Sequence, residues 1–203
     1  MTTTVVSTKI RRVRKEVRQL SASEWKKVVD AIWIMKLTDD AVGKKIYGDN
    51  FISYDRLVVR HGIASLDSRG DQAHFGPAFN TFHSCFLREA ENSLIAIDKS
   101  IIGLPYWDTS TKTSVFNKKF FGSLVGTGDD YTVTDGVFRN WPIANYDAIS
   151  APSNSIRISN PYGLLRHPLN VNKSRYATRR GNCYNYASVI ILFNILLIII
   201  MLS

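Results

Sequence analysis

The stretch HFGPAFNTFHSCFLREAENSL, residues 74–94, decides how this 203-residue chain is expected to fold. Its two histidines, His74 and His83, are nine residues apart, which corresponds to about 900° of a continuous α-helix and would point them to opposite sides. Gly76 and Pro77 resolve this geometry, because proline favours the first position of a helix and glycine loosens the turn before it. We therefore expect His74 to lie ahead of a helix and His83 to lie within it.

Two long helices are predicted. The first runs from Pro77 to about Ile95 and buries apolar side chains, among them Phe79, Phe82, Phe86 and Leu94. The second runs from Ala22 to about Lys36, because Ser21 and Glu24 form a capping box in which the hydroxyl and the carboxylate satisfy free amides at the helix start. Its apolar positions fall mostly on one side, so it should pack on a core.

The remaining pattern indicates a mainly α fold with long ordered loops. A short helix is expected from Tyr54 to His61, with Ser53 able to cap it and Gly62 able to end it in a left-handed turn. Residues 103–172 are rich in Gly, Pro, Asn, Ser and Thr, which predicts ordered loops over the core.

Composition sets further bounds. An apolar content of 45% in a chain of this length suits one globular domain, and the formal charge of +9 with pI near 9.6 would suit an anionic partner. The basic residues cluster at the two ends, and no nucleic-acid reading motif accompanies them, so no nucleic-acid partner is expected. They are Lys9, Arg11, Arg12, Arg14, Lys15 and Arg18 at the start, and Lys173, Arg175, Arg179 and Arg180 later.

Neither the cysteines nor the start of the chain assigns a compartment. Cys85 and Cys183 are too few for a disulfide scaffold. The first twelve residues, MTTTVVSTKIRR, lack the apolar core of a secretory signal. The localisation and the oligomeric state stay open.

The chain has four histidines: His61, His74, His83 and His167. Three neutral imidazoles of loop and helix origin can hold one copper, zinc or iron ion, and imidazole alone does not select among these metals.

Several motifs surround these histidines in a fixed order. His74 and His83 are followed by Glu91 and then by Pro-Tyr-Trp-Asp at 105–108, while YDRLVVRHG brings His61 upstream. The arrangement resembles the first copper-binding half of tyrosinases, catechol oxidases and molluscan-type haemocyanins, the type 3 copper family. Weaker similarity extends over about residues 13–168. The resemblance implies an incomplete tyrosinase-like central helical bundle.

The resemblance also implies a cofactor, ligands and an activity. Copper would be bound by His61, His74 and His83, and the substrates would be phenols or o-diphenols together with dioxygen. Residues with supporting or structural roles would be Phe82, Glu91, Trp107 and Asp108. One departure is Ser84, which follows His83 where the family often has arginine. Another is that Gln72 and Ala73 precede His74, so no cysteine can be cross-linked to that histidine there.

The family's second copper site has no counterpart among the residues given. That site uses a histidine pair three residues apart and a further histidine, whereas only His167, which we interpret as a surface residue, follows His83. The expected function is therefore that of a truncated copper-dependent phenol oxidase. The alternative is a non-catalytic copper-binding or interaction module, attached to a membrane through residues 189–202.

Three segments are expected along the chain. Residues 1–20 form a basic N-terminal segment, residues 21–172 the first half of the copper-binding domain, and residues 173–203 a basic and then apolar tail. The run VIILFNILLIIIMLS in this tail is shorter than the roughly 20 residues that span a bilayer upright. It is a membrane anchor, a segment packed on the half domain or an artefact of the gene model, and the sequence leaves these open.

Overall fold

The computed structural model describes residues 12–65, 70–71, 73–74, 77–108, 110–111, 113–125 and 132–142. Within these ranges the chain forms a 3₁₀ turn, η1 (Val17–Gln19), and four α-helices, with no named strand. The helices are α1 (Ala22–Leu37), α2 (Asp40–Tyr47), α3 (Tyr54–Ser65) and α4 (Phe79–Ile97). The predicted mainly α class is therefore confirmed. His167 and the apolar tail lie outside the described residues.

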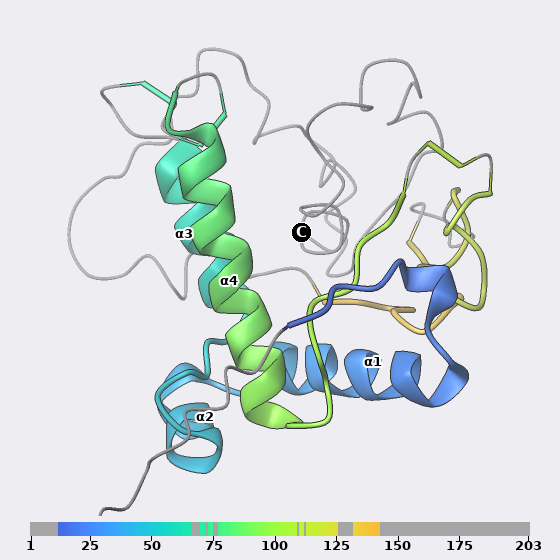
Figure 1. Cartoon of the computed structure of the whole chain (residues 1–203), viewed down its shortest axis with the longest axis horizontal. Coiled ribbons are helices and arrows are strands. Elements are labelled where there is room, and N and C mark those ends of the chain that lie inside the picture. Colours follow the sequence, from blue (N-terminus) through green and yellow to red (C-terminus); the bar gives the residue numbers. More distant parts are fainter. Residues whose placement is uncertain are drawn as a thin grey trace, which may run out of the picture.

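Helices α3 and α4 stand side by side, and α1 packs against both and extends sideways from the lower half of α4 (Figure 1). The capping box predicted for α1 is present, with the Glu24 N–H donating to Ser21 Oγ at 3.2 Å and the Ser21 N–H donating to Glu24 Oε2 at 2.8 Å. Among the described residues, no helix combines the length and the apolar character needed to cross a bilayer.

Two predicted helix boundaries were wrong. Helix α3 continues through Gly62 to Ser65, and Gly62 is buried, so packing of the helix outweighs the cost of about 1 kcal/mol for glycine in a helix interior. Helix α4 begins at Phe79, not at Pro77, with Ala78 as its N-cap residue. His74 still precedes the helix, and the Ser53 hydroxyl caps α3 by accepting from the Arg56 N–H at 3.2 Å.

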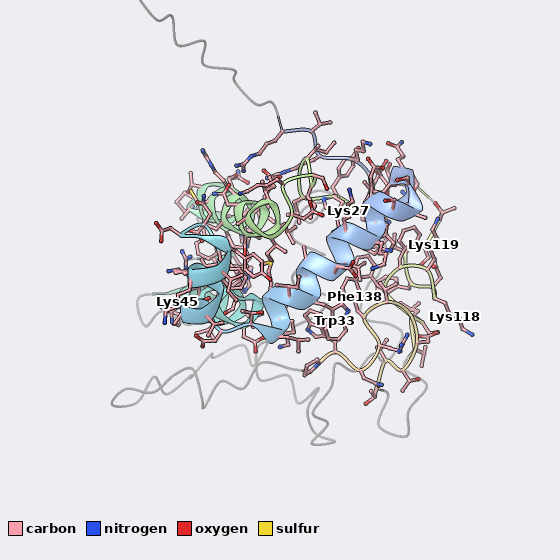
Figure 2. All side chains as sticks on the ribbon, turned by 90° about the horizontal axis from the view of Figure 1, so that it is seen from below. Lys27, Trp33, Lys45, Lys118, Lys119 and Phe138 are labelled. Carbon is pink, nitrogen blue, oxygen red and sulfur yellow. The ribbon has the colours of Figure 1, made fainter. Side chains whose placement is uncertain are left out.

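The loops after α4 pack on α1 through large aromatic residues. Trp25 donates its indole N–H to the Lys119 carbonyl at 3.0 Å, and Trp33 donates to the Val137 carbonyl at 2.9 Å. Figure 2 shows Trp33 and Phe138 together on the side of α1 that faces these loops. Indole donors thus hold these irregular segments on α1. Buried rings in this cluster are Trp25, Phe120, Phe121, Phe138 and Trp141.

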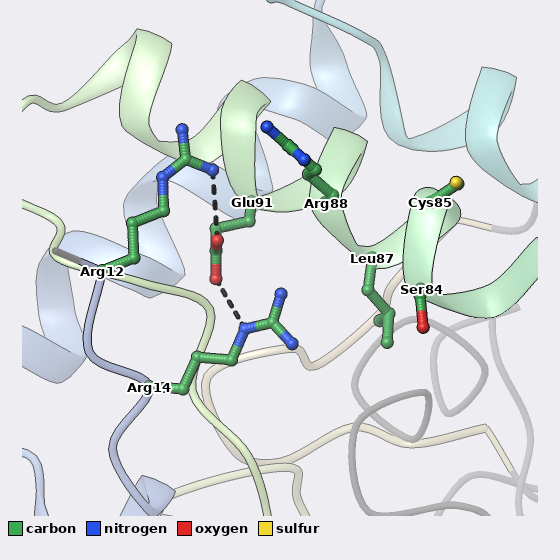
Figure 3. A pocket seen from close by; sticks show the side chains of 7 residues that line it. All are labelled: Arg12, Arg14, Ser84, Cys85, Leu87, Arg88 and Glu91. Atoms are coloured by element: carbon green, nitrogen blue, oxygen red, sulfur yellow. Dashed lines mark hydrogen bonds and ion pairs between the residues drawn. The ribbon is translucent and has the colours of Figure 1, made fainter. Parts of the chain in front are cut away.

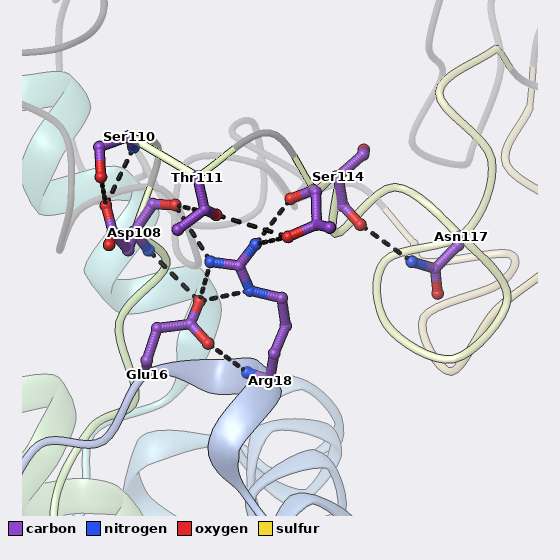
Figure 4. Close-up of polar contacts among 8 residues, drawn as sticks. Glu16, Arg18, Asp108, Ser110, Thr111, Ser114 and Asn117 are labelled. Atoms are coloured by element: carbon purple, nitrogen blue, oxygen red, sulfur yellow. Dashed lines mark hydrogen bonds and ion pairs between the residues drawn. The ribbon is translucent and has the colours of Figure 1, made fainter.

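The N-terminal segment is held to the chain that follows α4 by backbone pairing. Val17 donates to the Tyr106 carbonyl at 2.7 Å, and Tyr106 donates to the Lys15 carbonyl at 2.9 Å. Figure 4 shows Glu16 and Arg18 extending this pairing, because Glu16 Oε1 accepts from the Asp108 N–H at 3.3 Å and Arg18 Nη2 donates to the Asp108 carbonyl at 3.1 Å. The described part of this segment is therefore fixed to the chain at residues 106–108.

Glu91 joins three parts of the chain. Its carboxylate accepts from Arg12 Nη1 at 3.1 Å, from Arg14 Nε at 2.7 Å and from the Leu104 N–H at 2.9 Å, and the residue is only 3% exposed. Burial alone would raise the pKa of Glu91, but the hydrogen bonds from Arg14, Leu104 and Arg12 outweigh it and hold the pKa below its usual range. The buried carboxylate therefore stays charged.

We predict that Glu91→Gln lowers the free energy of unfolding by about 2 kcal/mol, because breaking a buried ion pair costs more than losing an exposed one. Urea unfolding followed by circular dichroism measures this. Asp30→Asn is the matched control: it breaks an exposed pair with Lys26 and should cost less than about 0.5 kcal/mol. Equal losses in the two variants would contradict the importance of Glu91.

The buried Glu91 carboxylate also predicts that the stability of the protein depends on pH. Since the folded pKa of Glu91 is depressed, its contribution to stability is complete above the ordinary glutamate pKa of about 4.3 and is lost as the pH falls through the folded value. The stability difference between wild type and Glu91→Gln should therefore shrink below about pH 4. A difference that stays constant over this range would contradict the assignment.

Candidate metal centre

Three histidines predicted from the sequence lie together at one end of the α3–α4 pair. His61 comes from α3, His74 from the turn before α4 and His83 from α4. One ring nitrogen of each lies within 4.8 Å of the others. The ring centroids of His61 and His74 are 4.9 Å apart, and those of His61 and His83 are 5.7 Å apart. The packing of α3 against α4, together with the turn before α4, thus brings the three rings into one cluster.

His83 presents its Nε2 atom to this cluster. Its Nδ1 lies 2.9 Å from the carbonyl oxygen of Phe79. Since a carbonyl can only accept, Nδ1 carries the proton and Nε2 carries the lone pair. Within the described part of the chain, His83 Nε2 is buried and has no hydrogen-bond partner. A buried polar atom without a partner is costly, and a metal ion would satisfy it.

Asp71 orients His74 in a comparable way. Its Oδ2 lies 2.9 Å from His74 Nδ1, and its Oδ1 accepts from the N–H groups of Ala73 at 2.8 Å and His74 at 2.9 Å. Burial would raise the pKa of Asp71, but the hydrogen bond from the His74 ring and those from the backbone hold it below the usual range. The ionised carboxylate only accepts, so Nδ1 of His74 is the protonated nitrogen and Nε2 carries the lone pair.

Burial favours the neutral form of two of the histidines. It lowers the pKa of His61 to about 4, with further lowering by the neighbouring His74 and His83 and a small opposing effect of Asp71. Burial also lowers the pKa of His83, against the effect of its hydrogen bond to Phe79. Neutral imidazole is the form that binds a metal ion, so these two rings need no deprotonation near neutral pH.

Aromatic rings cover the cluster. The Phe82 ring centroid lies 5.1 Å from that of His83 and 6.1 Å from that of His61, and Phe86 stacks on Phe82 at 5.9 Å. Phe79 lies 4.2 Å from His83 by the same measure. Phe86 is buried, whereas Phe79 and Phe82 are half-buried. These rings limit the access of water to the histidines.

The other residues singled out in the sequence lie elsewhere. Glu91 is eight residues beyond His83 on α4, which is about 12 Å along the axis, and binds the arginines described above. Trp107 is buried with its ring 5.7 Å from Phe116, and Asp108 accepts from Ser110 N–H at 2.9 Å. The structure therefore places these three residues in the support of the fold and not around the histidines.

The contact between Asp71 and the ring of His74 was not predicted from the sequence. The signal was present, because an aspartate often accepts from the backbone N–H groups two and three residues further on, and here those groups belong to Ala73 and His74. Reading the Asp-x-x-His spacing as such a turn would have placed the carboxylate next to the ring of His74.

The residues fit a metal ion. Three imidazoles from different elements converge, two have their Nδ1 committed to an acceptor, and one Nε2 is buried without a partner in the described region. In a loaded site, metal–nitrogen distances of about 2 Å would bring the nitrogens roughly 3 to 4 Å apart, so only a small inward movement is needed. An all-imidazole donor set suits copper, among other metals.

Comparisons with known proteins point to one family. The sequence model for the common central domain of tyrosinase matches residues 52–190. A tyrosinase of Streptomyces antibioticus is 32% identical over 142 residues, which cover 64% of this chain and 46% of that protein. A tyrosinase of Streptomyces lincolnensis is 33% identical over the same length, with the same coverage. The chain spans about half the length of these bacterial relatives.

A nematode protein gives a similar match. The tyrosinase-like protein tyr-3 of Caenorhabditis elegans is 31% identical over 147 residues, which cover 68% of this chain and 18% of that protein. The matched region is therefore a part of larger proteins in both groups.

We predict that Asp71→Ala changes the tautomer of His74 in the metal-free protein, because the acceptor of the Nδ1 proton is lost. Nitrogen NMR of the imidazole rings measures this, with His83 as an internal control whose signals should stay in place. Asp71→Asn retains an acceptor oxygen and should keep the Nδ1–H form. If His74 keeps the same tautomer in Asp71→Ala, the orienting role of Asp71 is wrong.

Proposed function

Because the chain belongs to the tyrosinase family, we propose that it binds copper through His61, His74 and His83 and acts in the oxidation of phenols or o-diphenols by dioxygen. Copper is the cofactor of this family. The observation that carries the proposal is the convergence of three ring nitrogens within 4.8 Å, with the Nε2 atom of His83 buried and without a partner in the described region.

The copper ion would supply one-electron redox chemistry and a place to bind oxygen. The protein's own part is to hold three imidazoles together, with the tautomers of His74 and His83 fixed by their hydrogen-bond acceptors. Phe79 fixes the ring of His83 through its carbonyl, and Asp71 fixes that of His74. Second-sphere contacts of this kind commonly change metal affinity by about 10- to 100-fold.

The half-buried rings beside the site favour an aromatic substrate. Phe82 lies next to both His61 and His83, so a phenol ring that approached these histidines would meet an apolar, aromatic edge. Ring pairs in offset or edge arrangements add about 0.5 to 1.5 kcal/mol beyond area burial. Conversion of an o-diphenol to an o-quinone removes two electrons and two protons, which dioxygen accepts.

The ligands present define the scope of the proposal. Outside the three-histidine group, the sequence contains one further histidine, His167. The residues given therefore supply ligands for one copper of the family's pair, and we propose that this segment is the first copper-binding half of the phenol-oxidising unit.

We predict that His83→Ala reduces bound copper from about one per chain to near zero while the helix content stays largely unchanged, because the substitution removes a ligand and alanine favours the helical conformation of α4. Metal analysis after dialysis and circular dichroism measure the two quantities. His167→Ala is the matched control and should retain copper. Stoichiometric copper in His83→Ala would contradict the ligand assignment.

Activity provides a separate test. The copper-loaded chain should form quinone from catechol faster than the same concentration of free copper, and His83→Ala treated in the same way should not exceed free copper. Absorbance of the quinone follows the reaction. If the wild-type chain binds copper with the predicted ligands but does not exceed free copper, the oxidase proposal fails and the copper site stands.

A further inference from the structure

A cavity lies between the N-terminal segment and α4. Its volume is about 610 Å³, within the range of ligand pockets. Figure 3 shows Arg12 and Arg14 reaching Glu91 from the N-terminal segment, with Arg88 projecting from α4. None of the three histidines of the metal centre lines this cavity, so the two sites are distinct. We call it the arginine pocket, and its lining residues are Arg12, Arg14, Ser84, Cys85, Leu87, Arg88 and Glu91.

The charges of the arginine pocket do not cancel. Among the described residues, three guanidinium groups and one carboxylate line it, which gives two positive charges in excess. The carboxylate of Glu91 is fully used, because Oε1 accepts from Arg12 and Oε2 accepts from Arg14 and from the Leu104 N–H. Arg88 is exposed and makes no hydrogen bond or ion pair with another described residue. An excess of two positive charges therefore remains.

Glu91 also fixes two of the guanidinium groups in place. Arg14 uses its Nε for Glu91 and Arg12 uses one Nη, so several N–H donors of each remain for a ligand. A guanidinium group held by one partner loses less conformational entropy when it binds a second. The buried Glu91 carboxylate thus holds the guanidinium groups of Arg12 and Arg14 in place before a ligand binds.

We propose that the arginine pocket binds an oxyanion with two negative charges, of the phosphate monoester class. Two charges would match the excess of the pocket, and arginine forks bind phosphate oxygens in a bidentate manner. The hydroxyl of Ser84 adds a further donor at the rim. The volume exceeds that of a phosphate group alone, so an organic substituent can lie beside Leu87.

The test is calorimetric titration of the metal-free, full chain with inorganic phosphate and with phenyl phosphate at constant ionic strength. We expect saturable binding of one anion per chain. Arg88→Gln should weaken it roughly tenfold, as expected for loss of charge-assisted hydrogen bonds. Arg139→Gln removes the same charge from an exposed position outside the pocket and should change the affinity less than about twofold.

A second pair of variants tests the pocket without removing an arginine. Ser84 is exposed on α4, so Ser84→Asp and Ser84→Asn should both fold, which circular dichroism checks. The aspartate should weaken phosphate binding by more than about tenfold, because it adds a negative charge to the pocket, and the asparagine should have little effect.

Three results would overturn the proposal. They are the absence of saturable binding up to about 10 mM phosphate, equal weakening by Arg88→Gln and Arg139→Gln, and equal effects of the two Ser84 variants. His83→Ala should bind phosphate as the wild type does, because the metal centre is separate. Loss of copper binding and loss of phosphate binding therefore report on different sites.

Discussion

The fold depends on a buried negative charge that must remain paired. Glu91 is 3% exposed, and a carboxylate at such a depth is stable only with donors on both oxygens. Those donors come from the N-terminal segment and from the backbone of Leu104, while the carboxylate itself belongs to α4. One side chain therefore fixes the relative positions of three segments. The helix that it anchors is the one that carries His83.

His83 and Glu91 occupy different stretches of α4. The metal centre and the ion pairs of Glu91 differ in how they offset the free-energy cost of burying a charge. At Glu91 the charge is retained and neutralised by arginine. At His61 and His83 the charge is avoided, since burial lowers both pKa values and leaves neutral rings. Between them, Arg60 of α3 pairs with Glu89 of α4 and joins the two helices that bring the histidines together.

Local patterns predicted α1, α3 and α4 but not α2, and the grouping of the three histidines was expected from the family resemblance. The capping box located the start of α1, and the Gly-Pro turn correctly separated His74 from His83. The end of α3 was missed because tertiary packing outweighed the helix-breaking tendency of Gly62. The partners of Glu91 could not be predicted, since Arg12 lies 79 residues away along the chain and no local rule connects them.

The short distance along the chain between the clustered histidines affects how the molecule folds. His61 and His83 are 22 residues apart, whereas Arg12 and Glu91 are separated by 79. Closing the shorter loop costs less chain entropy, and contacts close in sequence tend to form sooner. During folding, α3 and α4 should therefore pair early, and the N-terminal segment should dock onto this helical hairpin late.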